Sequence, residues 1–333
     1  MSKPTIKDVA KLAGVSISTV SRVMNDSKPV SPEARRKVLD AIEKLDFKPN
    51  ELARSLVMRR SNLIGIVVKD IGIPYMAQII RGIEEIGRMY KYDIMLSSTY
   101  GDQNSEKNVV DFLLRKQVEG IILISEDTNP EILYKLKSEK PPFIQIDKFS
   151  DFEDTYTVRI DYDLAIQNMM GYLIDKGHRK IAFIKGPHDT ATSEEKNAGY
   201  HKACEKHGLE PVEIESKGNQ VEDGYELGPK ILELKDEITC VMFSDDCQAV
   251  GFMNYCYDHD VKIPEDISVT GFGDQPIARY LRPALTTIQE PYYDIGAVSM
   301  RILVKVLREN YKIQENTFLP SQIMERESVK DLK

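Results

Sequence analysis

The first 25 residues contain two short stretches in which apolar positions recur at helical spacing, separated by a glycine. The first stretch places its apolar side chains on one face, at Ile6, Val9, Ala10 and Ala13. Thr5 can cap this helix, and Asp8 stands three residues further on, as in a capping box. Gly14 is suited to end the helix. The pattern therefore predicts a helix between Thr5 and Gly14.

A second helix is predicted directly after the turn, with Ser16 as its N-cap. Its inward positions are Val20, Val23 and Met24. The opposite face is small and polar with a single cation, and it consists of Ile17, Ser18, Ser21, Arg22 and Asn25. Such a face suits the major groove of DNA. Arg can donate two hydrogen bonds to guanine, hydroxyls can reach bases or phosphates, and an Ile methyl can contact thymine.

A third helix follows the first two. Ser31 can cap it and Pro32 suits its first turn. The apolar stripe that we expect to be buried is Val38, Leu39, Ile42 and Leu45. Two short helices alone could equally be part of a larger fold, whereas three helices of this size complete a helix-turn-helix module.

The charge distribution supports DNA binding by this end of the chain. Residues 1–60 hold 13 Lys and Arg against 7 Asp and Glu, and the remaining residues hold 32 against 46. A basic end can approach DNA, while the acidic remainder discourages indiscriminate coating of the polyanion. The balance favours site-specific binding over DNA packaging.

From about residue 61 short β-branched runs alternate with amphipathic stretches, as in parallel βαβ units. Strands are predicted in two series, at 63–68, 94–97, 120–124 and 143–146, then at 158–160, 181–184, 240–243 and 267–270. Helices are predicted at 75–90, 104–117, 162–176, 194–207, 222–234, 246–259 and 293–309. Two series imply two doubly wound α/β lobes. The default ligand site is then a cleft at the carboxyl ends of the strands.

These residues resemble the LacI/GalR family of bacterial transcriptional regulators over nearly the whole chain. The landmarks, in family order, are TIKDVAKLAGVS, VSRVMN, KVLDAIEKLDFKPN, ELARSL, GHRKIAFIKGP, VKIPEDISVTGFGD and RPALTTI. The resemblance implies a helix-turn-helix headpiece at 1–49, a hinge helix at 50–60, and a two-lobed core like that of periplasmic sugar-binding proteins at 61–333. It also implies a homodimer that binds double-stranded operator DNA and represses genes of carbohydrate metabolism.

The length of the hinge segment limits its stability as a helix. Residues 50–58 favour a helix, but about nine residues are too few for a stable isolated helix, so they should fold only with a partner. In the family this segment becomes helical on operator DNA, and a Leu that matches Leu56 enters the minor groove. A plain amphipathic linker is the alternative. We expect DNA contacts from Thr5, Ser16, Ile17, Ser18, Thr19, Ser21, Arg22, Asn25, Asn50, Ala53 and Leu56.

The cleft departs from relatives that respond to sugars. Lys196 stands where those relatives have an Arg, and Gly273 stands where they have an Asp. We therefore expect the cleft not to bind sugar hydroxyls in the usual way of the family, and the cation favours a sugar phosphate or a carboxylate over a plain sugar effector. The residues assigned to the effector cleft are Asp70, Asp147, Lys196, Asp245, Asp246 and Asp274, with capping of strand ends as the alternative role of the carboxylates.

Two further stretches, MYKYDI at 89–94 and YDIGAVSMR at 293–301, resemble a catabolite-control subgroup of the family in low-GC Gram-positive bacteria. In that subgroup the corresponding surface binds the phosphocarrier protein HPr phosphorylated on serine. Asp294, Arg301, Lys305 and Arg308 fall on one helical stripe, whose cations could hold a phosphate or could form only a solvated face. Gln322 stands where the subgroup carries an Arg. The partner residues that we expect are Tyr90, Tyr92, Asp294, Arg301 and Lys305.

Enzymatic and membrane functions find little support in the sequence. GFG at 271–273 lacks the third glycine of a dinucleotide-binding loop, and His201, Cys204 and His207 lack a fourth ligand for structural zinc. No apolar run approaches the length of a membrane span, and four cysteines without a CxxC pair suit a reducing cytoplasm. We therefore expect a cytoplasmic regulator without a cofactor. The rival is a core-type sugar-binding protein with no role on DNA.

Overall fold

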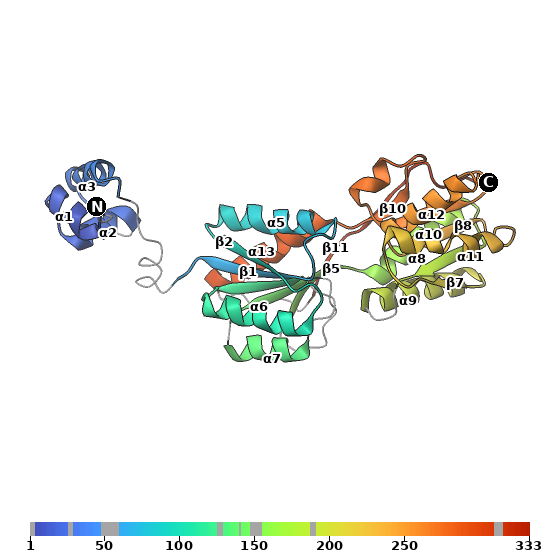
Figure 1. Cartoon of the computed structure of the whole chain (residues 1–333), viewed down its shortest axis with the longest axis horizontal. Helices are drawn as coiled ribbons and strands as arrows, with labels where there is room; N and C mark the ends of the chain where they lie inside the picture. The colour runs from blue at the N-terminus through green and yellow to red at the C-terminus, as the bar shows by residue number, and fades with distance from the viewer. Residues whose placement is uncertain are drawn as a thin grey trace. The chain divides into compact units, whose positions relative to one another are not determined.

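The computed structural model describes residues 4–25, 29–47, 60–124, 129–139, 141–146, 155–186, 191–309 and 316–333 (Figure 1). Backbone contacts divide the chain into two compact units, Met1–Ser61 and Asn62–Lys333. Among these described residues, no helix combines the length and the apolar character that a membrane crossing needs.

The N-terminal unit contains three helices, α1 (Ile6–Ala13), α2 (Ile17–Asn25) and α3 (Pro32–Lys44). They pack around Val9, Val20 and Val38, one from each helix, and all three side chains are fully buried. Phe47 is buried in the same cluster. The unit therefore has an apolar core of its own.

The ends of these helices follow the predicted capping pattern. The Thr5 backbone N–H donates to Asp8 Oδ2 over 2.8 Å. Ser16 Oγ and Ser31 Oγ each accept from the backbone N–H three residues further on, over 3.1 and 3.3 Å. Gly14 ends α1 in the left-handed region, at φ +65°. The caps fix where each helix begins and ends, so the turn between α1 and α2 is defined.

One prediction for α3 is wrong. Leu39 is 52% exposed, whereas Ala41 is buried together with Val38. Positions 38, 41, 42 and 45 share one face of a helix, and position 39 is turned by about 100° from position 38. Leu39 therefore points away from the core although it is strongly apolar.

The second unit has two lobes, each built on a sheet of six strands (Figure 1). The first sheet has the order β11-β5-β4-β3-β1-β2, with β1 (Leu63–Val68), β2 (Asp93–Ser98), β3 (Gly120–Ile124), β4 (Phe143–Ile146), β5 (Tyr156–Ile160) and β11 (Asn316–Leu319). The second has the order β12-β10-β9-β8-β6-β7, with β6 (Ile181–Lys185), β7 (Val212–Glu215), β8 (Cys240–Phe243), β9 (Ser268–Gly273), β10 (Thr286–Gln289) and β12 (Gln322–Met324). Neighbouring strands run parallel, except that β12 is antiparallel to β10.

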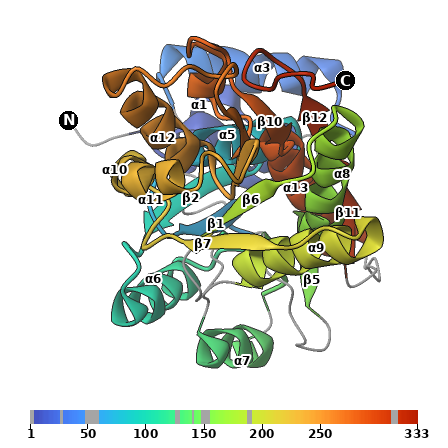
Figure 2. The ribbon, with the colours of Figure 1, turned by 90° about the vertical axis from the view of Figure 1, so that its right-hand side faces the viewer.

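Helices cover both faces of each sheet. In the first lobe α5 (Met76–Met89) and α13 (Tyr292–Glu309) lie on one face, and α6 (Gln103–Arg115) and α7 (Pro130–Glu139) lie on the other (Figure 1). In the second lobe α8 (Tyr162–Asp175) and α9 (Ala191–His207) lie opposite α10 (Val221–Glu226), α11 (Gly228–Glu233) and α12 (Asp246–Asp258) (Figure 2). A short 3-10 helix, η1 (Pro276–Arg279), follows β9. The central strands are thus buried on both sides, which accounts for their continuous apolar runs.

The chain passes between the lobes three times, from β5 to α8, from β10 to α13 and from β11 to β12. After the second crossover α13 packs closely against α5. A Cβ on Gly82 of α5 would lie 2.1 Å from the Tyr293 carbonyl oxygen, and one on Gly296 of α13 would lie 2.1 Å from that of Ile79. The two glycines therefore permit this close helix crossing.

The predicted fold class, an all-α headpiece with a two-lobed doubly wound α/β core, is confirmed. The single helix predicted at 222–234 is wrong, because the chain divides at Leu227 into α10 and α11. Pro229 in the first turn of α11 lacks the N–H that a continuous helix would need. Helix α7 and strands β7, β10, β11 and β12 were not predicted.

Candidate DNA-binding and effector sites

Helix α2 presents the predicted polar face to solvent. Ile17 is 45% exposed, and Ser18 and Arg22 are exposed as well. On the other side of the helix Val20 and Val23 are buried in the core of the N-terminal unit. The buried valines hold the helix in place, so the exposed side chains are displayed on a rigid support.

Three hydroxyl groups gather at the N-terminus of α2. Ser16 Oγ lies 2.7 Å from Ser18 Oγ and 2.9 Å from Thr19 Oγ1. The first backbone N–H groups of a helix are natural donors to phosphate, and hydroxyls beside them can donate too. This end of α2 is therefore chemically suited to contact a DNA backbone.

The other residues predicted to contact DNA are placed as follows. The Thr5 hydroxyl donates to Asp8 Oδ2 over 2.7 Å, and Ser21 is half-buried. Asn25 ends α2, but its side chain lies outside the described residues. Asn50, Ala53 and Leu56 lie outside them as well, as does the predicted hinge except for Arg60.

In the second lobe, Lys196 of α9 reaches the carboxyl end of β8. Its Nζ donates to the Ser244 carbonyl oxygen over 3.0 Å. The same atom lies 3.8 Å from the centre of the Phe272 ring and 5.2 Å from that of Tyr162. The aromatic faces stabilise the ammonium, so Lys196 provides a fixed positive charge at this end of the sheet.

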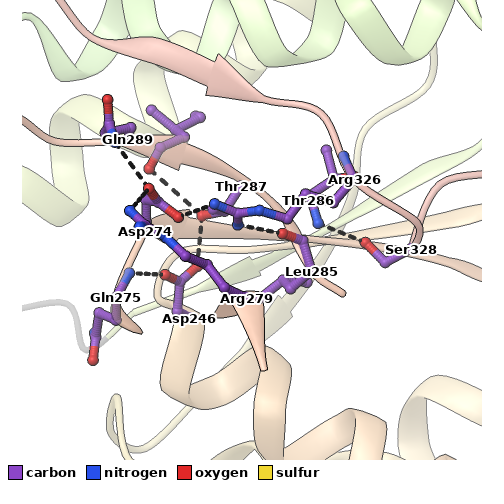
Figure 3. Close-up of polar contacts among 11 residues, drawn as sticks. Asp246, Asp274, Gln275, Arg279, Leu285, Thr286, Thr287, Gln289, Arg326 and Ser328 are labelled. Atoms are coloured by element: carbon purple, nitrogen blue, oxygen red, sulfur yellow. Dashed lines mark hydrogen bonds and ion pairs between the residues drawn. The ribbon is translucent and has the colours of Figure 1, made fainter. Parts of the chain in front are cut away.

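Asp245 and Asp246 lie just after β8, beyond Ser244, and have different roles. Asp245 Oδ1 caps α12 by accepting from the Cys247 backbone N–H over 2.7 Å. Asp246 is fully buried and accepts from Thr287 Oγ1 over 2.6 Å and from the Gln275 backbone N–H over 2.7 Å (Figure 3). Burial raises the pKa of Asp246 to about 7. Asp246 therefore ties α12 to β10 and to the segment that follows β9.

The carboxylate of Asp274 forms hydrogen bonds and ion pairs within the second lobe. Its Oδ2 accepts from Arg279 Nη2 over 3.0 Å and from Gln289 Nε2 over 2.9 Å, and its Oδ1 is paired with Arg326 (Figure 3). Arg326 also donates to the Leu285 carbonyl oxygen over 2.7 Å. Oδ1 thus holds the C-terminal segment at the end of β9, and Oδ2 joins η1 to β10.

The remaining residues assigned to the cleft are not brought to this cluster. Asp70 follows β1 in the first lobe, where its Oδ1 accepts from the Gly72 backbone N–H over 2.8 Å. Asp147 lies outside the described residues. Gly273 has φ +125°, a conformation that L side chains rarely adopt. An aspartate at this position would therefore be strained.

Sequence reasoning missed a group of aromatic side chains beside Lys196. The Tyr162 and Phe272 rings stack with their centres 5.8 Å apart, and Tyr75 and Tyr292 stack at 4.7 Å. Glu290 accepts from the hydroxyls of Tyr162 and Tyr292 over 3.1 and 3.2 Å. These residues come from distant parts of the chain, and no local motif marks them.

Helix α13 carries the stripe that was predicted to bind a phosphoprotein. Asp294, Arg301 and Lys305 are all exposed. Arg308 donates to the Tyr90 carbonyl oxygen over 2.6 Å and lies 5.2 Å from the centre of the Tyr90 ring. Tyr92 is buried, with the Arg308 guanidinium 5.5 Å from its ring centre. The guanidinium of Arg308 is thus held by the two tyrosines.

The α9 residues considered for metal binding do not converge. Cys204 is buried, whereas His201 is exposed and its Nε2 lies 3.0 Å from Glu213 Oε1. In the part of the chain that the structure describes, no group of three His, Cys, Asp or Glu side chains could hold a metal ion.

Known proteins share this architecture. Residues 5–50 match the family described as bacterial regulatory proteins, lacI family, and residues 170–329 match the periplasmic binding protein-like domain. Catabolite control protein A of Priestia megaterium is 35% identical, over 98% of this chain and 99% of its own length. The solved structure of transcription regulator CcpA of Lactococcus lactis has a TM-score of 0.73 at 32% identity, covering 80% of this chain and 99% of that one.

The fold is also that of the lac repressor. A crystal structure of its dimer, bound to operator and the anti-inducer ONPF, has a TM-score of 0.89 and covers 99% of this chain and 100% of that chain, at 24% identity. The identity to catabolite control protein A extends over almost the whole chain, and the matched relatives are regulators rather than enzymes. The chain therefore belongs to the LacI family of bacterial regulatory proteins and is a DNA-binding regulator of transcription.

Proposed function

We propose that the protein acts as a cytoplasmic homodimer that binds operator DNA through α2 and represses genes of carbohydrate metabolism. The exposed face of α2 carries this proposal, because Ile17, Ser18 and Arg22 stand on a helix that buried valines hold in place. The hydroxyls at its N-terminus add contacts suited to the DNA backbone. The likeness to catabolite control proteins supports carbohydrate metabolism as the regulated process.

Residues 50–60 are proposed to complete the operator complex as a hinge helix. In this role Leu56 would enter the minor groove, and Asn50 and Ala53 would contact the DNA beside it. A segment of this length becomes helical only when a partner supplies stabilising contacts. Binding of the operator would therefore fold the hinge.

Selection from a library of random-sequence duplexes tests the proposal. A dimer with two-fold symmetry should enrich a palindrome whose half-sites are separated by a fixed spacing. Enrichment of one unrepeated half-site would contradict the dimeric mode of binding. If no sequence is enriched, the rival interpretation as a binding protein without a role on DNA is favoured.

The proposed effector of the cleft is a phosphorylated or carboxylate metabolite. Lys196 supplies a positive charge at the end of β8, and the backbone at Gly273 disfavours the aspartate that sugar-responsive relatives carry. Calorimetry with a hexose and its 6-phosphate should show binding of the phosphate alone, and Lys196→Met should weaken it. Lys206→Met, an exposed change on the same helix, is the control. Tight binding of the plain hexose to Lys196→Met would contradict the assignment.

Serine-phosphorylated HPr is the proposed protein partner, with Arg301 and Lys305 beside the phosphate and Asp294 and Tyr90 at the same surface. Tyr92 is buried, so its part in the proposed site is to hold Arg308 from below the surface. The partner should tighten operator binding, because it can shift the equilibrium only by preferring the DNA-binding state. Arg301→Glu should abolish this effect and leave operator affinity without the partner unchanged. Lys230→Glu makes the same charge change on exposed α11 and should retain the effect. The proposal is wrong if phosphorylated HPr at micromolar concentration leaves the operator affinity of the wild-type protein unchanged.

A further inference from the structure

Buried side chains cluster where the chain crosses between the two lobes. Arg159 and Tyr162 flank the first crossover, Glu290 and Tyr292 flank the second, and Phe318 precedes the third. The first four of these side chains are buried, and each of the five contacts another member of the group. The three crossovers are therefore joined by side-chain contacts as well as by the backbone.

Tyr162 contacts residues on both sides of the cluster. Its hydroxyl donates to Glu290 Oε2 over 3.1 Å, which joins the first crossover to the second. The Arg159 guanidinium lies 5.2 Å from the centre of its ring, and Lys196 Nζ lies at the same distance. One ring thus contacts both a crossover residue and the lysine at the end of β8.

Arg159 extends these contacts to the third crossover and to the second lobe. Its guanidinium lies 6.0 Å from the centre of the Phe318 ring, and it forms an ion pair with Glu195 of α9. Because the side chain is only 1% exposed, these interactions are poorly screened by solvent. Arg159 therefore connects the strands of the first lobe to a helix of the second.

Glu290 extends these contacts to the start of α5 in the first lobe. Its Oε1 accepts from the Tyr292 hydroxyl, and the Tyr292 ring stacks on Tyr75 at the start of α5. Burial raises the pKa of Tyr292 well above its ordinary value, so this hydroxyl keeps its proton and remains a donor. The carboxylate of Glu290 is thus shared between a helix of each lobe.

We propose that the Tyr162–Glu290 hydrogen bond couples the three crossovers, so that they open together as one hinge and set the angle between the lobes. Glu290 is buried, so no water replaces the Tyr162 hydroxyl when this hydrogen bond is lost, and the loss weakens every contact that depends on the position of Tyr162. Tyr162 and Glu290 are positioning residues in this account. The inference rests on the proposed regulation of operator binding by an effector and by HPr, but its test requires neither operator nor effector.

Hydrogen exchange of the full-length protein tests the coupling. Tyr162→Phe removes the hydroxyl and keeps the ring. Amide hydrogen exchange should then accelerate about tenfold at all three crossovers, including Phe318 and Leu319 at the third crossover, far along the chain from Tyr162. Tyr200→Phe is the matched control, because its buried hydroxyl donates to the Ile181 carbonyl oxygen within the second lobe. In the control variant the amide hydrogens at the crossovers should exchange at the wild-type rate.

Acceleration confined to the segment around Tyr162, or equal in the control variant, would overturn the proposal. A second pair of variants covers the case in which Tyr162→Phe fails to fold. Glu290→Gln can still hydrogen-bond both tyrosine hydroxyls and should exchange nearly as the wild type does, whereas Glu290→Leu should accelerate all three crossovers. Equal exchange at the crossovers in these two variants would contradict a role for the hydrogen bond.

Discussion

Asp246 is a carboxylate that is fully buried in the second lobe. Burial disfavours its charge most, the nearby Asp245 and Asp274 disfavour it further, and the two hydrogen bonds that it accepts offset these effects only in part. These effects place the pKa of Asp246 at about 7, whereas in the unfolded chain the carboxyl group would titrate near its ordinary value of 3.8. The proton on this residue is therefore linked to folding.

The linkage predicts how stability varies with pH. Because the folded-state pKa is raised, the contribution of Asp246 is complete below pH 3.8 and is lost as the pH rises through about 7. Asp246→Asn should remove this loss, so the wild-type protein should lose on the order of 1 to 3 kcal/mol more unfolding free energy than the variant between pH 5 and pH 8. Urea unfolding at both pH values measures the difference. Parallel pH profiles for the two proteins would show that Asp246 does not titrate in this range.

The sequence predicted the contacts of some residues but not those of others. The caps at Ser16 and Ser31 were predictable because each acts on a backbone group three residues away. The partners of Tyr162 and Asp274 were not, because Glu290 and Arg326 are 128 and 52 positions distant in the chain. Such pairs form only when the tertiary fold brings distant segments of the chain together.

At the scale of elements, the crossing of α5 and α13 depends on two glycines. A Cβ on Gly296 would lie 2.1 Å from the Ile79 carbonyl oxygen, so the helices would have to move apart. We expect Gly296→Ala to destabilise the protein by roughly 1 to 3 kcal/mol, as overpacking of a core does. Thermal unfolding of the full-length chain measures the change.

The same substitution in open space is the matched control. Gly171 lies within α8, and a Cβ there would meet nothing within 4 Å. Gly171→Ala should therefore raise stability by about 0.5 to 1 kcal/mol, because alanine favours a helix more than glycine does. If both variants are stabilised, the close crossing of α5 and α13 is contradicted.

The sequence predicted the central strands more accurately than some strands at the sheet edges. The central strands, such as β1 and β3, have long β-branched runs and were predicted with their observed limits. The strands at the sheet edges, such as β7 and β11, are short and half-exposed, so their patterns resemble loops. For the candidate site, α2 was predictable from local spacing, whereas the aromatic cluster beside Lys196 depends on the tertiary fold.

At the scale of the whole molecule, charge is divided unevenly along the chain. Positive charge is concentrated in residues 1–60, and the rest of the chain is acidic. DNA affinity should therefore fall steeply as salt is raised, on specific and random duplexes alike, because phosphate contacts release counterions. Affinities for different duplexes are comparable only at one salt concentration.

The most direct test of operator recognition by α2 is a titration of full-length protein with the selected operator and with a scrambled duplex at one salt concentration. Arg22→Ala should lose roughly 1 to 3 kcal/mol on the operator and much less on the scrambled duplex, because a base contact is lost only where its base is present. Arg36→Ala removes an exposed charge from α3 and should weaken both duplexes alike. Equal losses on both duplexes for Arg22→Ala would contradict sequence reading by α2.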